Sequence, residues 1–155
     1  MTDKGRLRLF RGLSAAGLLL WMAVIFWFSS QNGETSGSLS EGVLNWILSL
    51  FPISLDGPAM ELLHFLFRKG AHFTEYLILA LLLMNVMGRW GETRPRRVLA
   101  AVIFSAIYAA TDEWHQSFVA QRFMSLADVG IDTAGALAGS LIYQACAAIH
   151  NGKKA

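Results

Sequence analysis

A long stretch without charge near the N-terminus places the strongest constraint on this chain. No charged residue occurs between Arg11 and Glu34, and residues 13–28 are almost wholly apolar. A helix of about 20 apolar residues rises the roughly 30 Å that the hydrocarbon core of a bilayer requires. The run is longer and more aromatic than the core of a signal peptide, and residues 28–30 make a poor cleavage site. We therefore expect a membrane anchor over residues 12–30.

Three more apolar runs follow, and they predict helices over residues 70–88, 97–117 and 126–149. The composition agrees, because 54% hydrophobic and 15% charged residues are too apolar for a typical soluble domain of 155 residues. The sequence therefore predicts an all-α fold, a single integral membrane domain that is a bundle of four transmembrane helices. Its expected partner is the lipid bilayer and not nucleic acid, whereas its oligomeric state stays open.

The basic residues predict which side of the membrane each connection faces. Three segments are rich in lysine and arginine, and in a four-span topology all three fall on one side. They contain Lys4, Arg6, Arg8 and Arg11; Arg89, Arg94, Arg96 and Arg97; and Lys153 and Lys154. Such an excess marks the cytoplasmic side of a membrane protein. We therefore expect both termini in the cytoplasm and a multi-pass protein of the bacterial cytoplasmic membrane.

The first external segment, residues 31–68, begins rich in glycine and serine and then becomes amphipathic. Apolar residues recur at helical spacing at Leu39, Val43, Trp46, Ile47 and Leu50, and residues 59–67 are again mostly apolar. We expect one or two short helices on the outer membrane surface, with Pro52 and Pro58 as breaks.

Each of the last three expected helices carries polar residues three or four apart, which places them along one side of the helix. The stripes are Lys69, His72, Glu75 and Tyr76; Ser105, Tyr108, Asp112, His115 and Gln116, with Glu113 off to one flank; and Ser125, Asp128 and Asp132. The topology brings the charged parts to the same outer level, and ionisable groups within a span usually face the bundle interior. We expect one outward-facing pocket. Beyond the last stripe, Gly135 and Gly139 form a Gly-x-x-x-Gly pattern that predicts close helix packing.

The expected pocket has more negative than positive charge. Carboxylates of Glu75, Asp112, Glu113, Asp128 and Asp132 face only Arg68, Lys69 and Arg122. Protonated histidines, protonated carboxylates or a bound cation would each compensate the excess. A divalent metal prefers the nitrogen and oxygen donors that His72, Glu75, Asp112 and His115 offer, with Asp128 and Asp132 as further oxygen donors. An ion-pair network that locks the bundle is the alternative.

Several segments resemble the VanZ-like family of bacterial membrane proteins, and the resemblance covers most of the chain. They are FSSQ at 28–31, KGAHFTEY at 69–76, TDEWHQ at 111–116, Arg122, and DVGIDTAG at 128–135. The chain departs from the family in two places. Ala120-Gln121-Arg122 stands where the family usually has Pro-Gly-Arg, and Asp132 stands where it usually has asparagine.

The resemblance implies a role in the cell envelope. Founding members of the family are linked to low-level resistance to teicoplanin, a glycopeptide that acts outside the cytoplasmic membrane. An outward-facing charged site suits a lipid-linked or cell-wall ligand, because such a ligand meets the protein at the outer leaflet. The chain has no phosphate-binding glycine loop, no Gly-x-Ser-x-Gly nucleophile and no cofactor fingerprint, so enzymatic activity is left open.

Our preferred hypothesis is a protein that binds or modifies such an envelope component. It assigns proton transfer, or ligation of a divalent metal, to His72, Glu75, Asp112 and His115. It assigns ligand binding to Lys69, Glu113, Gln116, Arg122, Asp128 and Asp132, with Lys69 and Arg122 on an anionic head group. The alternatives are a structural or partner-binding protein, whose charges only stabilise the bundle, and a small proton-coupled transporter.

Overall fold

The computed structural model of the chain describes residues 3–51, 55–89 and 94–152. Within these ranges the fold is all-α, as expected, with no strand among the described residues. The helices are α1 (Asp3–Ser29), α2 (Gly33–Ser49), α3 (Gly57–Arg89), α4 (Arg94–Gln116) and α5 (Leu126–Gly152).

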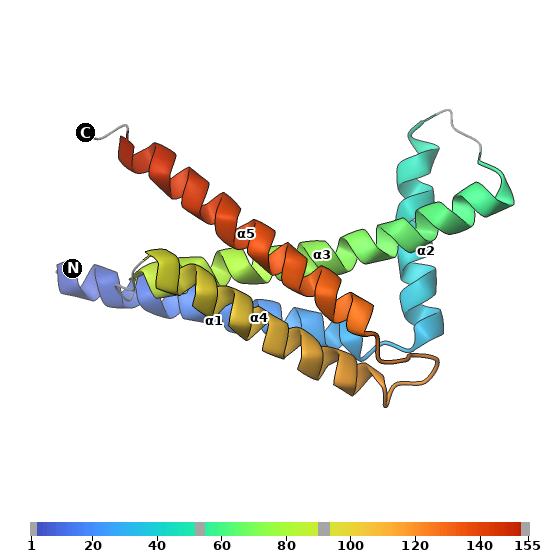
Figure 1. Ribbon diagram of the computed structural model, residues 1–155, viewed down its shortest axis with the longest axis horizontal. Helices are drawn as coiled ribbons and strands as arrows, with labels where there is room; N and C mark the ends of the chain where they lie inside the picture. The colour runs from blue at the N-terminus through green and yellow to red at the C-terminus, as the bar shows by residue number, and fades with distance from the viewer. Residues whose placement is uncertain (1–2, 52–54, 90–93, 153–155) are drawn as a thin grey trace.

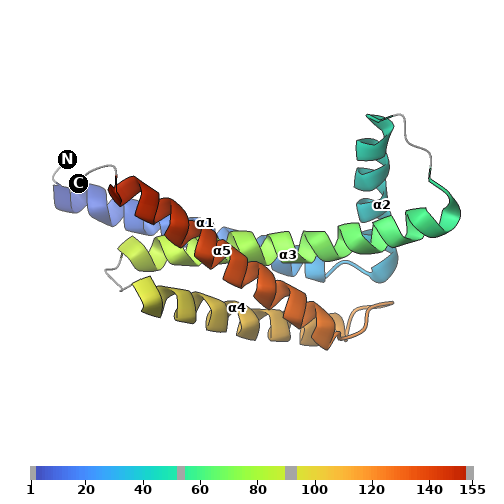
Figure 2. The same cartoon turned by 45° about the horizontal axis from the view of Figure 1, so that its top comes forward.

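Four of the helices run along the length of the molecule, and α2 runs across them at one end (Figure 1). The second view shows that α1, α3 and α4 lie side by side while α5 crosses α3 obliquely (Figure 2). The first turns of α1 and α4 and the last turns of α3 and α5 lie at the opposite end from α2. The basic segments at the start of α1 and of α4 are thus at the same end, whereas Lys153 and Lys154 lie outside the described residues.

The structure differs from the sequence expectation at the external segment. Residues 59–67 do not form a separate short helix, because α3 continues without interruption from Gly57 to Arg89. Pro58 does not break it, since a proline in the first helical turn lacks only an N–H that would have no partner there. The Asp56 side chain accepts a hydrogen bond of 3.0 Å from the Ala59 backbone N–H and caps the helix. The expected break at Pro52 lies outside the described residues.

Large apolar side chains are exposed on the outside of the molecule, whereas several charged side chains are buried within it. Two helices, Lys4–Ser29 and Gly57–Gly88, are long and apolar enough to cross a membrane. Large exposed apolar residues occur on every helix, among them Leu19, Trp46, Leu62, Leu99, Ile107 and Leu141. By contrast, Asp132 is 0% and Glu113 1% exposed. Exposed large apolar side chains together with buried carboxylates favour a lipid environment for this protein.

Helix α5 packs mainly against α3, and two glycines allow their close approach. A Cβ atom at Gly135 would lie 2.2 Å from the carbonyl oxygen of Phe73, and one at Gly139 would lie 2.3 Å from that of Leu77. The tight packing that the Gly-x-x-x-Gly pattern predicted is therefore confirmed, with α3 as the neighbour. This contact fixes the height at which the charged first turns of α5 meet α3.

The apolar core lies between α1, α3 and α4. It contains Ile25, Tyr76, Leu79, Leu83, Met84, Ala101 and Ala109. Helix α1 is held to the core by two hydrogen bonds: the Trp21 indole N–H donates to the Glu75 carbonyl oxygen at 2.9 Å, and the Tyr108 hydroxyl donates to the Met22 carbonyl oxygen at 2.8 Å. Both bonds join α1 to residues of the polar stripes on α3 and α4, and they fix the position of α1 beside these stripes.

Candidate functional site

A pocket of about 380 Å³ opens where the last turns of α1 and α4 meet α2 and α3. One part of its wall is apolar and is formed by Ile25, Phe28, Leu39, Val43, Phe67 and Ala71. The other part is polar and is formed by Ser29, Gln31, Ser36, Ser40, Arg68, His72, Glu75, Asp112, Gln116 and Arg122. The structure therefore brings five of the predicted site residues together around one cavity: His72, Glu75, Asp112, Gln116 and Arg122.

Arg122 organises the floor of the pocket, although it lies in the turn between α4 and α5. Its side chain is 7% exposed and donates from Nη1 to Gln116 Oε1 at 2.9 Å and from Nε to the Gln31 carbonyl oxygen at 3.2 Å. Gln116 in turn donates to Asp112 Oδ2 at 3.0 Å. Burial and the nearby charge of Arg68 lower the pKa of Arg122, but a guanidinium stays protonated in proteins. A positive charge is thus fixed beside the pocket.

In the turn that carries Arg122, Gln121 has a backbone conformation that is unusual for a residue other than glycine. Gln121 has φ of 60°, in the left-handed region where glycine is normally found. This is the position where the VanZ-like family usually has glycine, and here the Gln121 side chain accepts a hydrogen bond of 3.2 Å from the Glu34 N–H. The Gly33 N–H donates to the Ala120 carbonyl oxygen at 3.0 Å. The start of α2 is therefore fastened to the turn that holds Arg122.

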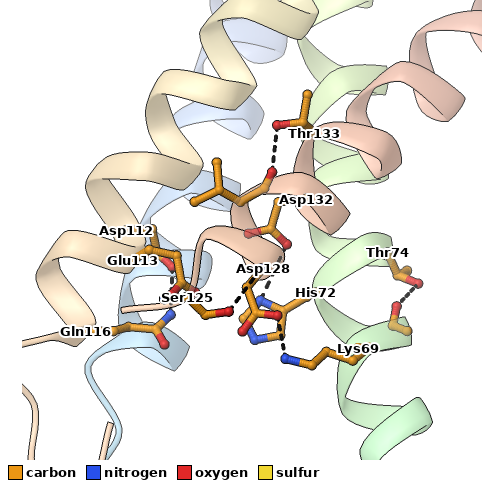
Figure 3. Close-up of polar contacts among 12 residues, drawn as sticks. Lys69, His72, Thr74, Asp112, Glu113, Gln116, Ser125, Asp128, Asp132 and Thr133 are labelled. Carbon is orange, nitrogen blue, oxygen red and sulfur yellow. Dashed lines mark hydrogen bonds and ion pairs between the residues drawn. The ribbon is translucent and has the colours of Figure 1, made fainter. Parts of the chain in front are cut away.

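A second cluster of polar side chains, which includes His72, lies between α3, α4 and α5. Donor atoms of His72, Glu113 and Asp132 all lie within 4.8 Å of one another. His72 Nδ1 is 3.5 Å from Asp132 Oδ1, and Figure 3 shows these two side chains facing each other from α3 and α5. Among the described residues, His72 Nδ1, Glu113 Oε1 and both carboxylate oxygens of Asp132 have no hydrogen-bond partner. We call these three residues the buried triad.

The N-terminus of α5 supports one member of the triad. The Ser125 N–H donates to Glu113 Oε2 at 2.7 Å, and the Ser125 hydroxyl accepts a hydrogen bond of 3.2 Å from the Asp128 N–H (Figure 3). Ser125 is therefore the N-cap of α5, a position that favours serine. A carboxylate at this point also gains from the partial positive charge of the helix N-terminus.

Replacing Ser125 by alanine is expected to destabilise the protein by about 1 kcal/mol, because the Asp128 N–H loses its capping acceptor. The free energy of unfolding in mild detergent, followed by circular dichroism, measures the change. Ser38→Ala is the matched control, since its hydroxyl donates only to the Thr35 carbonyl within α2. An equal effect of the two substitutions would contradict the capping role.

Three predicted site residues lie outside both groups. Lys69 forms an ion pair with Asp128, and its ammonium lies 5.3 Å from the centre of the Phe65 ring. His115 packs against Phe26 of α1, with 4.7 Å between the ring centres and the rings tilted by 38°. The expected metal set of His72, Glu75, Asp112 and His115 is thus divided in the structure: His72 joins Glu113 and Asp132, which the sequence had assigned to ligand binding.

Arg68 lines the pocket and was not among the predicted site residues. Lys69, its neighbour in sequence, was chosen for the anionic head group and instead pairs with Asp128. The helical period contained a signal for Arg68, because residues four and seven positions further along α3 are His72 and Glu75, which line the same pocket. No ion-pair partner of Arg68 is found among the described residues.

The fold and the site are those of a helical membrane protein, in which large apolar side chains are exposed and several charged side chains are buried. The chain belongs to the VanZ/LLP1 family, whose family model matches residues 15–147. The resemblance found in the sequence is thereby confirmed. The matched residues include the polar pocket, the turn with Arg122 and the buried triad. No curated protein and no solved structure gives a significant match to the chain.

Proposed function

We propose that this protein spans the cytoplasmic membrane four times and binds the anionic head group of a lipid or lipid-linked envelope component in its pocket. The observation that carries the proposal is the two-sided wall of the pocket. Apolar side chains from α1, α2 and α3 face charged side chains from α3, α4 and the turn after α4. A ligand with a charged head and an apolar chain matches both parts of such a cavity.

The arrangement of the helices supports the topology. Helices α1, α3, α4 and α5 run along the same long dimension, and the basic starts of α1 and α4 lie at the end away from the pocket (Figure 1). If that end faces the cytoplasm, as the excess of lysine and arginine favours, the pocket faces the exterior. Helix α2 then runs along the outer surface, where Trp46 is exposed toward the lipid while Leu39 and Val43 line the pocket.

Arg68 and Arg122 line the pocket together with the carboxylates of Glu75 and Asp112, and the two arginines are the groups that would bind an anion. Arg68 and Arg122 are close enough for the charge of Arg68 to lower the pKa of Arg122. Two guanidinium groups that border one cavity repel each other, and a phosphate between them would remove that repulsion. Arg122 already donates to Gln116 and to the backbone carbonyls of Gln31 and Phe28, so Arg68 is the guanidinium with more donors left for a ligand. Glu75 and Asp112 then lie beside the bound head group.

Binding of a short-chain phosphatidylglycerol to the purified full-length protein, measured by native mass spectrometry, tests the proposal. Wild type is expected to bind it more tightly than a phosphatidylcholine of the same chain length and more tightly than glycerol phosphate, which has no chains. Arg68→Gln is expected to weaken phosphatidylglycerol binding about tenfold, since a charge-assisted hydrogen bond contributes about 1.5 kcal/mol or more.

Arg8→Gln is the matched control, because it removes the same charge from an exposed position on the opposite end of the bundle. It is expected to bind phosphatidylglycerol as wild type does. The proposal is wrong if wild type does not distinguish the two lipids, or if Arg68→Gln and Arg8→Gln bind equally well. In either case the charged groups would act in the stability of the bundle and not in ligand binding.

A further inference from the structure

We propose that the buried triad of His72, Glu113 and Asp132 is a binding site for one divalent transition-metal ion. The triad lies outside the wall of the lipid pocket except for His72, and the proposal does not depend on a lipid binding there. It also differs from the metal set that the sequence suggested: Glu113, and Asp132, which the sequence offered only as a further oxygen donor, take the place of Glu75, Asp112 and His115.

The distance between two of the donor atoms fits metal ligands better than a hydrogen bond. His72 Nδ1 and Asp132 Oδ1 are 3.5 Å apart. An N–H···O hydrogen bond has its most frequent length at about 2.9 Å. Two ligands of a tetrahedral zinc ion, each about 2.05 Å from the metal, are about 3.3 Å from each other. A small inward movement of the donor atoms, which already lie within 4.8 Å of one another, would complete the site.

The burial of unpaired carboxylate oxygens is the second observation that points to a cation. Asp132 is 0% exposed and Glu113 is 1% exposed. In the described part of the chain, both oxygens of Asp132 and Oε1 of Glu113 lack a hydrogen-bond partner, and the charged partner of Asp132 Oδ1 is His72, at 3.5 Å. Buried carboxylates are normally paired or coordinate a metal, because removing an ion from water is costly. One imidazole faces two buried carboxylates here, and the Lys69 ammonium is paired with Asp128.

The surroundings of the triad resemble the supports that metal ligands usually have. Glu113 accepts a hydrogen bond of 2.7 Å from the Ser125 N–H through Oε2, which leaves Oε1 for an ion. Ligating carboxylates are commonly held by such a bond to their other oxygen. The three ligands also come from three helices, α3, α4 and α5 (Figure 3). The contacts of Gly135 and Gly139 set the height of α5 relative to α3.

The donor set indicates which ions the site would take. One imidazole nitrogen with two carboxylate oxygens suits Zn²⁺ or Mn²⁺, whereas Ca²⁺ and Mg²⁺ prefer oxygen donors alone. Three protein ligands leave a fourth position of a tetrahedral ion for water or a ligand oxygen. Because His72 also lines the pocket, the ion would lie at the pocket wall.

Metal content and thermal stability of the full-length protein in detergent test the site. The protein is treated with a chelator, divided, and reloaded with Zn²⁺, Mn²⁺ or Mg²⁺ before removal of unbound ions. We expect about one Zn²⁺ or Mn²⁺ per chain by elemental analysis, no retained Mg²⁺, and an unfolding temperature that rises with the bound ion. This measurement needs no variant, so it stands even if a substitution prevents folding.

Asp132→Asn and Glu113→Gln are expected to lose the bound ion and the rise in unfolding temperature. Glu75→Gln is the matched control: it removes a carboxylate that lies on α3 near His72 and lines the pocket but is not part of the triad. It is expected to retain the ion. In the absence of any metal, Asp132→Asn should unfold at a temperature no lower than that of wild type, because it removes a fully buried carboxylate whose charged partner, His72, lies 3.5 Å away.

Two results would overturn the proposal. One is a wild-type protein that retains neither Zn²⁺ nor Mn²⁺ after reloading. The other is retention of the ion by Asp132→Asn and Glu113→Gln at the wild-type level, which would place the metal elsewhere. Loss of lipid binding in Arg68→Gln with metal content unchanged would show that the pocket and the triad are independent sites.

Discussion

Replacing Gly135 by alanine is expected to reduce the free energy of unfolding by about 3 kcal/mol, because overpacking a close contact costs this much or more when neither partner is able to move. The added Cβ would lie 2.2 Å from the Phe73 carbonyl oxygen, which belongs to the backbone of α3. A backbone oxygen in a helix does not rotate away as a side chain would, so α5 must separate from α3. Denaturant titration in mild detergent, followed by circular dichroism, measures the loss.

Gly130→Ala is the matched control, because Gly130 lies in the same helix and a Cβ there would meet nothing within 4 Å. It is expected to be neutral or to stabilise the protein by up to about 1 kcal/mol, since alanine favours the helix over glycine. Gly139→Ala should behave like Gly135→Ala, with its Cβ 2.3 Å from the Leu77 carbonyl oxygen. Equal stability of the Gly130 and Gly135 variants would mean that α5 does not pack on α3 as the structure has it.

The same contact explains why the packing of α5 was predictable from sequence while the details of the site were not. Two glycines four residues apart lie on the same face of a helix, and the absence of side chains on that face lets the backbone of another helix approach closely. The pattern alone therefore predicted the tight contact. It did not identify α3 as the partner, because any of the other helices could have met that face.

Glu113 shows the limit of reasoning from helical stripes. The stripe through Asp112 and Gln116 places Glu113 on a flank, and a flank is exposed when a helix packs on one neighbour only. Helix α4 packs on both α3 and α5, so it buries two faces, and Asp112 is 6% and Glu113 1% exposed. The number of neighbours of a helix is a property of the tertiary structure, and the sequence pattern does not contain it.

The division of the histidines has a similar cause. His72 and His115 were assigned to one centre because both lie on polar stripes at the same height. His115 turns toward α1 and packs against Phe26, whereas His72 faces α5. Sequence spacing fixes the direction of a side chain relative to its own helix, but the rotation of each helix in the bundle depends on contacts such as those of Gly135. The polar pocket was thus predicted as a region and not as a set of contacts.

Arg122→Ala is expected to destabilise the protein by about 3 kcal/mol, because it leaves the buried Gln116 Oε1 and the part-buried carbonyl oxygen of Gln31 without their donor, and each costs about 1–3 kcal/mol. The carbonyl oxygen of Phe28 also loses Arg122 but keeps the Gln31 N–H as a donor. Arg122→Lys should recover only part of this stability, since the single ammonium group of lysine cannot donate hydrogen bonds to all the acceptors that a guanidinium reaches. Arg8→Ala, on the exposed start of α1, is the control and should be neutral.

Hydrogen exchange separates this effect from a general loss of stability. The Gly33 N–H donates to the Ala120 carbonyl oxygen, so its protection reports whether the turn that carries Arg122 still holds the start of α2. In Arg122→Ala this amide is expected to exchange faster than amides in the core of α3, because the contact opens before the bundle unfolds. Uniformly faster exchange along the chain would instead mean that Arg122 stabilises the whole bundle and does not position α2. Since α2 supplies Leu39 and Val43 to the pocket, local opening would also weaken binding of phosphatidylglycerol.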